Sequence, residues 1–174
     1  HGDAVIRRLA AAGQDLDVVP YGLEALGVMR IEKGHVAGNE LTGRTSAPQL
    51  GLGRMLSTKK DYIGARLARL PALDDPADTQ LIGLKPADGK TRLVSGAHFL
   101  PIGSATTYDH EQGYVTSVAY SPSLGHWIAL GLLKNGRQRH GERLRAVDLL
   151  RGQETEVVIC DPVFIDPQGE RLRG

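Results

Sequence analysis

The apolar and polar positions of this chain change pattern near residue 76. Before that point the pattern predicts helices at residues 4–13, 21–27, 46–50 and 61–69. In the first of these, Val5, Leu9 and Ala12 share one helical face. Asp61 is a suitable N-cap for the last. The first part of the chain is therefore expected to be partly helical.

Residues 28–32, VMRIE, show a different spacing from these predicted helices. Apolar Met29 and Ile31 alternate with charged Arg30 and Glu32, and strict alternation is typical of a half-buried strand. We therefore predict a strand at 28–32, with Arg30 and Glu32 on its polar side.

From residue 76 onward, short alternating runs are separated by Gly, Pro, Asp and Ser. The predicted strands are TQLIGLKP (79–86), GYVTSVAYS (113–121), HWIALGLLK (126–134), ERLRAVDLL (142–150) and TEVVICDP (155–162). Turn signals at 88–89, 121–125 and 135–136 favour a small antiparallel barrel or sandwich. The segment PALDDPAD (71–78) is the natural boundary, which predicts an α+β region at 1–75 and a β barrel at 76–174.

Composition restricts the class of protein. The 174 residues include 41% hydrophobic ones, enough for a packed core, and a single cysteine. A net charge of only +1 and 5% aromatic residues argue against nucleic-acid binding. No apolar run approaches the roughly 20 residues that span a bilayer. We expect a soluble, cytoplasmic protein that contacts neither membrane nor nucleic acid.

The usual catalytic and metal-binding signatures are weak here. Gly51-Leu52-Gly53 lacks the third glycine and the preceding strand of a nucleotide-binding loop. The histidines show no metal-binding spacing, so we expect no metal site. Cys160, near the end of an apolar strand, fits a buried, inert thiol.

Two charged features remain as candidate binding sites. Glu32 sits in an apolar run between Arg30 and Lys33, and a carboxylate held away from water needs a partner. It can form a structural ion pair with either base or anchor a ligand. The basic cluster at 134–145 can hold an anionic ligand tail through Arg137, Arg139 or Arg143, or be a solvated hairpin rim, the commoner case.

Several motifs resemble those of the aminomethyltransferases, the glycine-cleavage T-protein family. Arg30-Ile31-Glu32-Lys33-Gly34 resembles the family's R-hydrophobic-E-x-G motif, and Lys59–Gly64 (KKDYIG) its basic turn before [DE][FY]xG. GYVTSVAYSPSLG (113–125) and VVICDPVFIDPQGERLRG (157–174) resemble parts of its C-terminal barrel. The resemblance covers essentially the whole chain.

Within this superfamily, the sequence is most similar to the C-terminal part of the alpha subunits of heterotetrameric sarcosine oxidases. The resemblance implies a protein that passes the iminium product of sarcosine oxidation to tetrahydrofolate, giving 5,10-methylenetetrahydrofolate. It also implies other sarcosine oxidase subunits as partners, with flavin and NAD elsewhere in the assembly. We expect the N-terminal half of the T-protein-like fold, with its catalytic aspartate, to be absent here and the chain alone to be inactive.

The resemblance also suggests which residues bind folate. It implies that Glu32 accepts hydrogen bonds from the pterin ring, with Arg30 of the same motif beside it, and that Lys60 contacts folate, with Lys59 as the alternative. No residue of this chain is expected to be catalytic. Arg54 replaces an aromatic residue of the family, so one wall of the pocket is expected to differ.

Two further interpretations stay open. The chain can belong to a glycine-cleavage aminomethyltransferase or a dimethylglycine-dehydrogenase-like protein, which carry similar domains. It can also be a subunit-assembly domain that does not bind folate.

Overall fold

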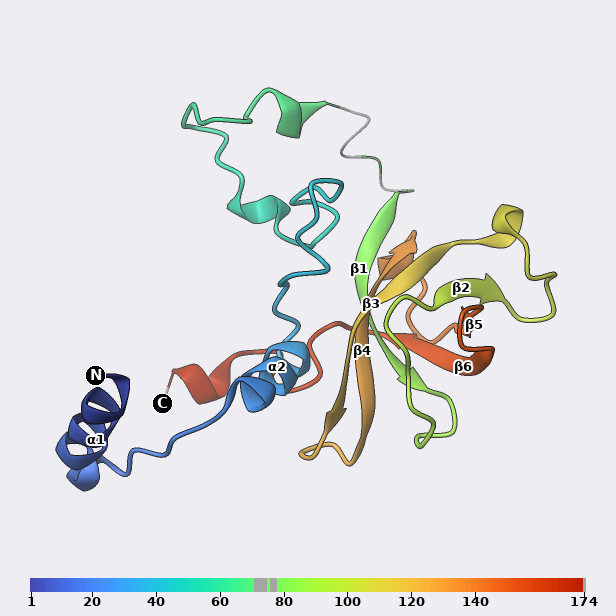
Figure 1. Ribbon diagram of the computed structural model, residues 1–174. Coiled ribbons are helices and arrows are strands. Elements are labelled where there is room, and N and C mark those ends of the chain that lie inside the picture. The colour runs from blue at the N-terminus through green and yellow to red at the C-terminus, as the bar shows by residue number, and fades with distance from the viewer. Residues whose placement is uncertain (71–74, 76–77, 174) are drawn as a thin grey trace.

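The computed structural model describes residues 1–70, 75 and 78–173 (Figure 1). Its α-helices are α1 (Gly2–Ala12) and α2 (Leu23–Glu32). Its strands are β1 (Thr79–Pro86), β2 (His98–Pro101), β3 (Gly113–Ser121), β4 (His126–Lys134), β5 (Arg143–Asp148) and β6 (Gln153–Cys160). The predicted α+β class with a small antiparallel barrel is confirmed. Most of the predicted boundary segment at 71–78 lies outside the described residues.

The six strands close into an antiparallel barrel in the order β1-β4-β3-β2-β5-β6. Closure joins β1 to β6, where Leu84 lies opposite Ile159. The largest buried side chain of the interior is Phe99 on β2, which packs with residues such as Ile82, Leu144 and Val157. Each strand of the closed barrel therefore has a hydrogen-bonded neighbour on both sides.

A second apolar cluster lies on the outer surface of the barrel, where α2 contacts β3 and β4. Ile31 on α2 packs there with Ile128, Leu130 and Leu132 of β4. Both faces of β4 are therefore buried, which explains why HWIALGLLK is almost continuously apolar. This contact fixes α2 against the barrel wall (Figure 1).

The strand predicted at 28–32 is wrong, because these residues form the C-terminal half of α2. Five alternating residues cannot distinguish a strand from a helix that buries Val28 and Ile31, three positions apart. The helix ends at Glu32; just beyond its C-cap, Gly34 has φ of +68°, and His35 N–H donates to the Arg30 carbonyl. This is a Schellman cap, which glycine forms without strain.

The helices predicted at 46–50 and 61–69 are also wrong. The first is a single turn, closed by a hydrogen bond from Leu50 N–H to the Ser46 carbonyl. The second is a series of turns followed by the 3-10 turn at Leu67–Arg69. Gly64 within it has φ of +90°, which an α-helix does not allow. Asp61 therefore caps no α-helix.

The predicted helices at 4–13 and 21–27 are confirmed in position, as α1 and the first half of α2. However, α1 has no buried residue, and Figure 1 shows it standing apart from the barrel. The predicted strands at 79–86, 113–121, 126–134, 142–150 and 155–162 correspond to β1, β3, β4, β5 and β6. The sequence analysis did not predict β2, which has only four residues and ends at Pro101.

Candidate functional site

A cleft of about 550 Å³ opens beside α2 on the barrel. Its lining residues come from α2, β3, β4, β6 and three loops: Arg30, Asn39, Arg92, Leu93, Val94, Ser95, Thr116, Ser117, Val118, Trp127, Arg151 and Gln153. This volume lies within the range of about 300–1,000 Å³ that is usual for small-molecule sites. The cleft combines a few apolar walls with an unusual number of guanidinium groups.

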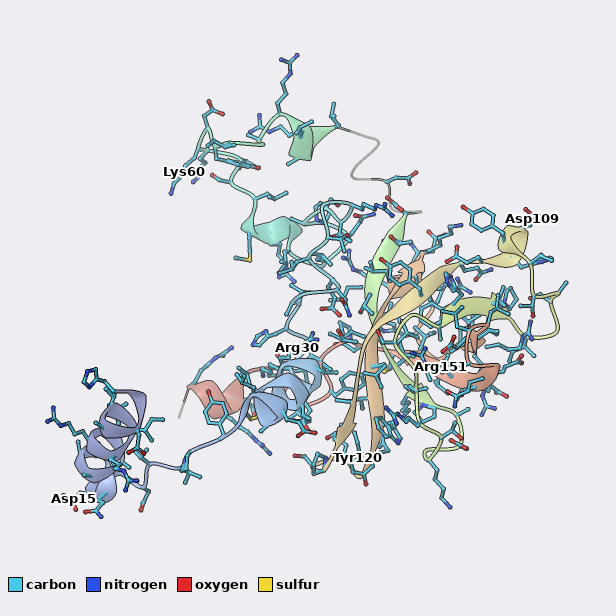
Figure 2. All side chains as sticks on the ribbon, viewed as in Figure 1. Asp15, Arg30, Lys60, Asp109, Tyr120 and Arg151 are labelled. Carbon is cyan, nitrogen blue, oxygen red and sulfur yellow. The ribbon has the colours of Figure 1, made fainter. Side chains whose placement is uncertain are left out.

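Three arginines from three different elements reach this cleft. Arg92 comes from the loop between β1 and β2. Arg30 comes from α2 and Arg151 from the turn between β5 and β6, and both are labelled in Figure 2. The Arg92 guanidinium carbon lies 5.4 Å from the centroid of the Trp127 ring, a cation–π contact. Arg151 Nη1 lies 2.7 Å from Asp148 Oδ2, and the hydrogen bond from Arg151 holds the pKa of Asp148 below its usual range.

Arg30 is held by two side chains. Its Nη1 lies 3.1 Å from Glu40 Oε2, and its Nη2 donates to Ser117 Oγ at 2.8 Å. Burial alone raises the pKa of Glu40, but hydrogen bonds from Ser117, Thr116 and Ala37 N–H, with the Arg30 charge, more than offset burial, so this pKa is lowered. Glu40 therefore stays ionised although its side chain is fully buried.

Glu32 is buried, with 7% of its surface exposed, but it does not line this cleft. Its Oε1 accepts a hydrogen bond of 2.5 Å from Ser121 Oγ, and no hydrogen bond joins its Oε2 to the described residues. Arg30 pairs with Glu40, and Lys33 pairs with Asp166 at 3.1 Å. The interpretation of Glu32 as the ion-pair partner of its flanking bases is therefore wrong.

Lys60 and Lys59 lie in a bend of the chain, and both residues are exposed. Their backbone N–H groups donate to Ser57 Oγ. Figure 2 shows Lys60 well away from both Arg30 and Arg151. Of the predicted folate-binding residues, the structure thus brings only Arg30 to the cleft.

The arginines of the basic cluster at 134–145 have partners within the protein. Arg137 donates to the backbone carbonyls of Pro48 and Gln49. Arg139 pairs with Glu142, and Arg143 with Glu156. None of the three lines the cleft, so these contacts favour the hairpin-rim interpretation.

Other candidate groups contribute little to this site. Burial raises the pKa of the Cys160 thiol to about 11, which disfavours the reactive thiolate, as expected of an inert thiol. In the described part of the chain, no group of three metal-ligating side chains comes together. None of the helices described has the length and apolar character needed to cross a bilayer.

Two models of known protein families match this chain. The model of the glycine cleavage T-protein C-terminal barrel domain matches residues 80–166. The chain belongs to this family. The model of the GCVT N-terminal domain matches residues 1–60, which include α2 and the Arg30 side of the cleft.

Among curated T-protein relatives, the sarcosine oxidase subunit alpha of Rhizobium meliloti (strain 1021) is 44% identical over 99% of this chain and 18% of the relative. That of Corynebacterium sp. (strain P-1) is 36% identical over 100% of this chain and 18% of the relative. The aminomethyltransferase of Saccharopolyspora erythraea is 34% identical over 92% of this chain and 42% of the relative. The chain thus spans less than half the length of each.

The crystal structure of the glycine cleavage system aminomethyltransferase T from Bartonella henselae has the same fold. It matches with a TM-score of 0.75 at 22% identity, over 94% of this chain and 45% of that one. The likeness extends over both the barrel and α2.

The sequence analysis missed Arg92, Arg151 and Trp127 as site residues. Each stands alone in its segment: Arg92 follows the DGKT turn, Arg151 the end of β5, and Trp127 lies near the start of β4. The only local signal was a lone arginine beside each of two turns, which is common on any surface.

Proposed function

We propose that this chain forms part of the tetrahydrofolate-binding region of a sarcosine oxidase alpha subunit. In the whole enzyme, the methylene carbon of the iminium formed from sarcosine is transferred to tetrahydrofolate, giving 5,10-methylenetetrahydrofolate and releasing glycine. The observation that carries this proposal is the cleft with three guanidinium groups and a tryptophan face. The 44% identity to a sarcosine oxidase subunit alpha supports it.

The chemistry of the cleft suits a folate. A folate has flat aromatic rings at one end and the carboxylates of its glutamate at the other. Arg30, Arg92 and Arg151 offer guanidinium groups, which bind carboxylates through paired, charge-assisted hydrogen bonds. The Trp127 ring offers an aromatic surface against which a flat ring packs favourably.

The role of this chain in the reaction would be to bind and orient the acceptor. Holding a folate amine beside an electrophilic iminium converts a bimolecular step into an effectively unimolecular one. Such a step needs no nucleophile from this chain. Glu32 remains a candidate acceptor for pterin N–H groups, because its Oε2 has no hydrogen-bond partner among the described residues.

Flavin and NAD are proposed to bind elsewhere in the assembly. The segment with Gly51 and Gly53 follows a turn rather than a strand and leads into the 3-10 turn at Gly53–Met55. A dinucleotide-binding loop instead follows a strand and opens an α-helix. This segment therefore does not fit the phosphates of either cofactor.

The test is calorimetric titration of 5-formyltetrahydrofolate, a stable reduced folate, into the full-length protein. Arg92→Met should weaken binding by about tenfold or more, since it removes a charged partner of a carboxylate. Arg143→Met is the matched control, because Arg143 pairs with Glu156 outside the cleft. Tetrahydropterin, which lacks the glutamate, should bind both variants equally. Absence of folate binding to the unaltered protein, or equal folate affinities in the two variants, would contradict the proposal.

A glycine-cleavage aminomethyltransferase is the nearest alternative, supported by the 34% identity to one such enzyme. The two differ in the donor of the one-carbon unit. Full-length protein with its partner subunits should form 5,10-methylenetetrahydrofolate from sarcosine. Formation only from an aminomethylated lipoyl protein would favour the alternative.

A subunit-assembly role is favoured by a separate observation. Val5, Ile6 and Leu9 on α1 are each more than half exposed, and the sarcosine oxidase relatives are subunits by name. Under this alternative, another sarcosine oxidase subunit covers α1 and folate does not bind. The calorimetric titration separates the two interpretations.

A further inference from the structure

The most completely buried charge in the described chain is Glu40, with 0% of its surface exposed. It follows α2 and lies against β3. Its Oε1 accepts hydrogen bonds from Thr116 Oγ1 at 2.6 Å and Ser117 Oγ at 2.5 Å. Its Oε2 accepts from Ala37 N–H at 2.9 Å and from Arg30 Nη1 at 3.1 Å. Each carboxylate oxygen therefore meets two donors.

Glu40 also sets the direction of a hydroxyl group that Arg30 uses. A carboxylate only accepts hydrogen bonds, so the Ser117 hydroxyl must give its one hydrogen to Glu40. The Ser117 oxygen then presents a lone pair to Arg30 Nη2, which donates to it at 2.8 Å. Glu40 thus orients both terminal nitrogens of the guanidinium. It accepts a hydrogen bond directly from Nη1, and it orients the Ser117 hydroxyl that accepts from Nη2.

The loop after α2, which carries Glu40, is held in place by hydrogen bonds that do not involve the Glu40 charge. Asn39 Nδ2 donates to the Thr116 carbonyl at 2.9 Å, and Thr45 Oγ1 donates to the backbone carbonyl of Glu40 at 2.7 Å. These neutral bonds already join the loop to β3 and to the following turn. A buried charge is costly unless it is paired, and among the described residues the cation paired with Glu40 is Arg30.

We propose that Glu40 is a positioning residue, which fixes the Arg30 guanidinium at the cleft wall so that its remaining N–H groups face an anionic ligand. This inference rests on the proposed function for the identity of the anion, a folate carboxylate. A long arginine side chain loses considerable rotamer freedom when a ligand immobilises it. Glu40 and Ser117 fix the side chain before the ligand arrives, so less of that entropy is lost on binding.

The test is a double-mutant cycle in the full-length protein. Glu40→Gln keeps the shape of the side chain and removes its charge, and Arg30→Met removes the guanidinium while keeping a helix-favouring residue. Affinity for 5-formyltetrahydrofolate is measured by calorimetry. Glu40→Gln should weaken binding about three- to tenfold alone, and should have no further effect in the Arg30→Met background. Glu142→Gln is the control, since it removes a carboxylate paired with Arg139 outside the cleft.

A purely structural role for Glu40 predicts a different result. The loss of affinity on Glu40→Gln would then be the same with and without Arg30, which would overturn the inference. Unchanged affinity on Glu40→Gln in the otherwise unaltered protein would overturn it too.

A second measurement keeps the inference testable without folate. The Nε–H NMR signal of Arg30 should show a rigid, slowly exchanging group in the unaltered protein and a mobile one in Glu40→Gln. An Arg30 signal that is equally rigid in both would refute the positioning role, even if a variant folds poorly or the protein binds no folate. If folate fails to bind while Arg30 is mobilised as expected, only the proposed function is refuted.

Discussion

At the residue scale, the candidate site consists of arginines whose guanidinium groups contact other side chains of the protein. Glu40 holds Arg30, Asp148 holds Arg151, and the Trp127 ring lies under Arg92. Each arginine keeps N–H groups that these partners do not use, because a guanidinium carries five. If the cleft binds a folate carboxylate as we propose, its walls would need little rearrangement.

The predicted role of Glu32 belongs to the same scale. Glu32→Gln keeps an oxygen that can accept from Ser121 but puts an NH₂ group where the second oxygen stood. If Glu32 accepts hydrogen bonds from a pterin ring, titration of 5-formyltetrahydrofolate into the full-length variant should show about tenfold weaker binding, since ligand donors would then face a donor. Equal affinities of the two proteins would remove Glu32 from this role.

Glu40 also makes a prediction about pH. Its pKa in the folded chain lies below the ordinary 4.5, so its ionised form stabilises the fold above that pH, and this contribution is lost as the pH falls through the lowered value. The free energy of unfolding of the unaltered chain should therefore exceed that of Glu40→Gln at pH 7, and the difference should shrink below pH 4.5. Urea unfolding between pH 3 and 7 measures it. Asp109→Asn, which alters an exposed 3-10 turn, is the control. Its free energy of unfolding should differ from that of the unaltered chain by the same amount at pH 7 and below pH 4.5.

The sequence indicated one part of this site and not the rest. Arg30 was recognisable because it lies in a contiguous motif with Glu32 and Gly34. Arg92, Trp127 and Arg151 come from separate segments that meet only when the barrel closes. No local pattern encodes that meeting, since it depends on strand order and register.

At the scale of elements, β4 is the most constrained part of the barrel because both of its faces are covered. Gly131 lies where β4 passes the Phe99 ring. A Cβ at this position would come within 2.9 Å of both Phe99 Cζ and the Tyr114 carbonyl oxygen. Phe99 is completely buried, so it has no room to move away.

Gly131→Ala should therefore destabilise the chain by about 1–3 kcal/mol through overpacking. Gly27→Ala in α2 is the matched control with the opposite sign, because a Cβ there meets no atom within 4 Å. Alanine in a helix interior is favoured over glycine by about 0.5–1 kcal/mol. Urea unfolding of both variants measures the effects. A Gly131→Ala chain as stable as the unaltered one would show that Phe99 can move away from β4 without cost.

The same elements show how far a sequence can predict this fold. Short apolar runs between turn signals identified β1, which is buried on both faces, and β3, in which less buried Tyr114, Val118 and Tyr120 are interspersed among buried residues. Alternation failed for residues 28–32, because the burial of Ile31 depends on contact with β4, which the local pattern does not reveal. It failed for β2 because four residues are too few to show a period.

At the scale of the whole molecule, burial is distributed unevenly along the chain. The barrel encloses a continuous apolar core. Next to it, α2 is attached by Ile31 and by hydrogen bonds from the Phe164 and Ile165 N–H groups to the Glu32 carbonyl. By contrast, α1 buries no residue. Local stability should follow this order, because opening a segment costs little where few apolar contacts are lost.

Hydrogen–deuterium exchange of the 174-residue chain should therefore show three levels of protection. Amides of β4 should exchange slowest, those of α2 faster, and those of α1 within seconds, since an isolated helix of 11 residues is marginal in water. Ile31→Ala should speed exchange in α2, because it removes the apolar anchor to β4, and leave α1 unchanged. Protection of α1 equal to that of β4 would contradict this ordering. It would mean that α1 is held by contacts that the structure of the single chain does not contain, such as those with a second copy.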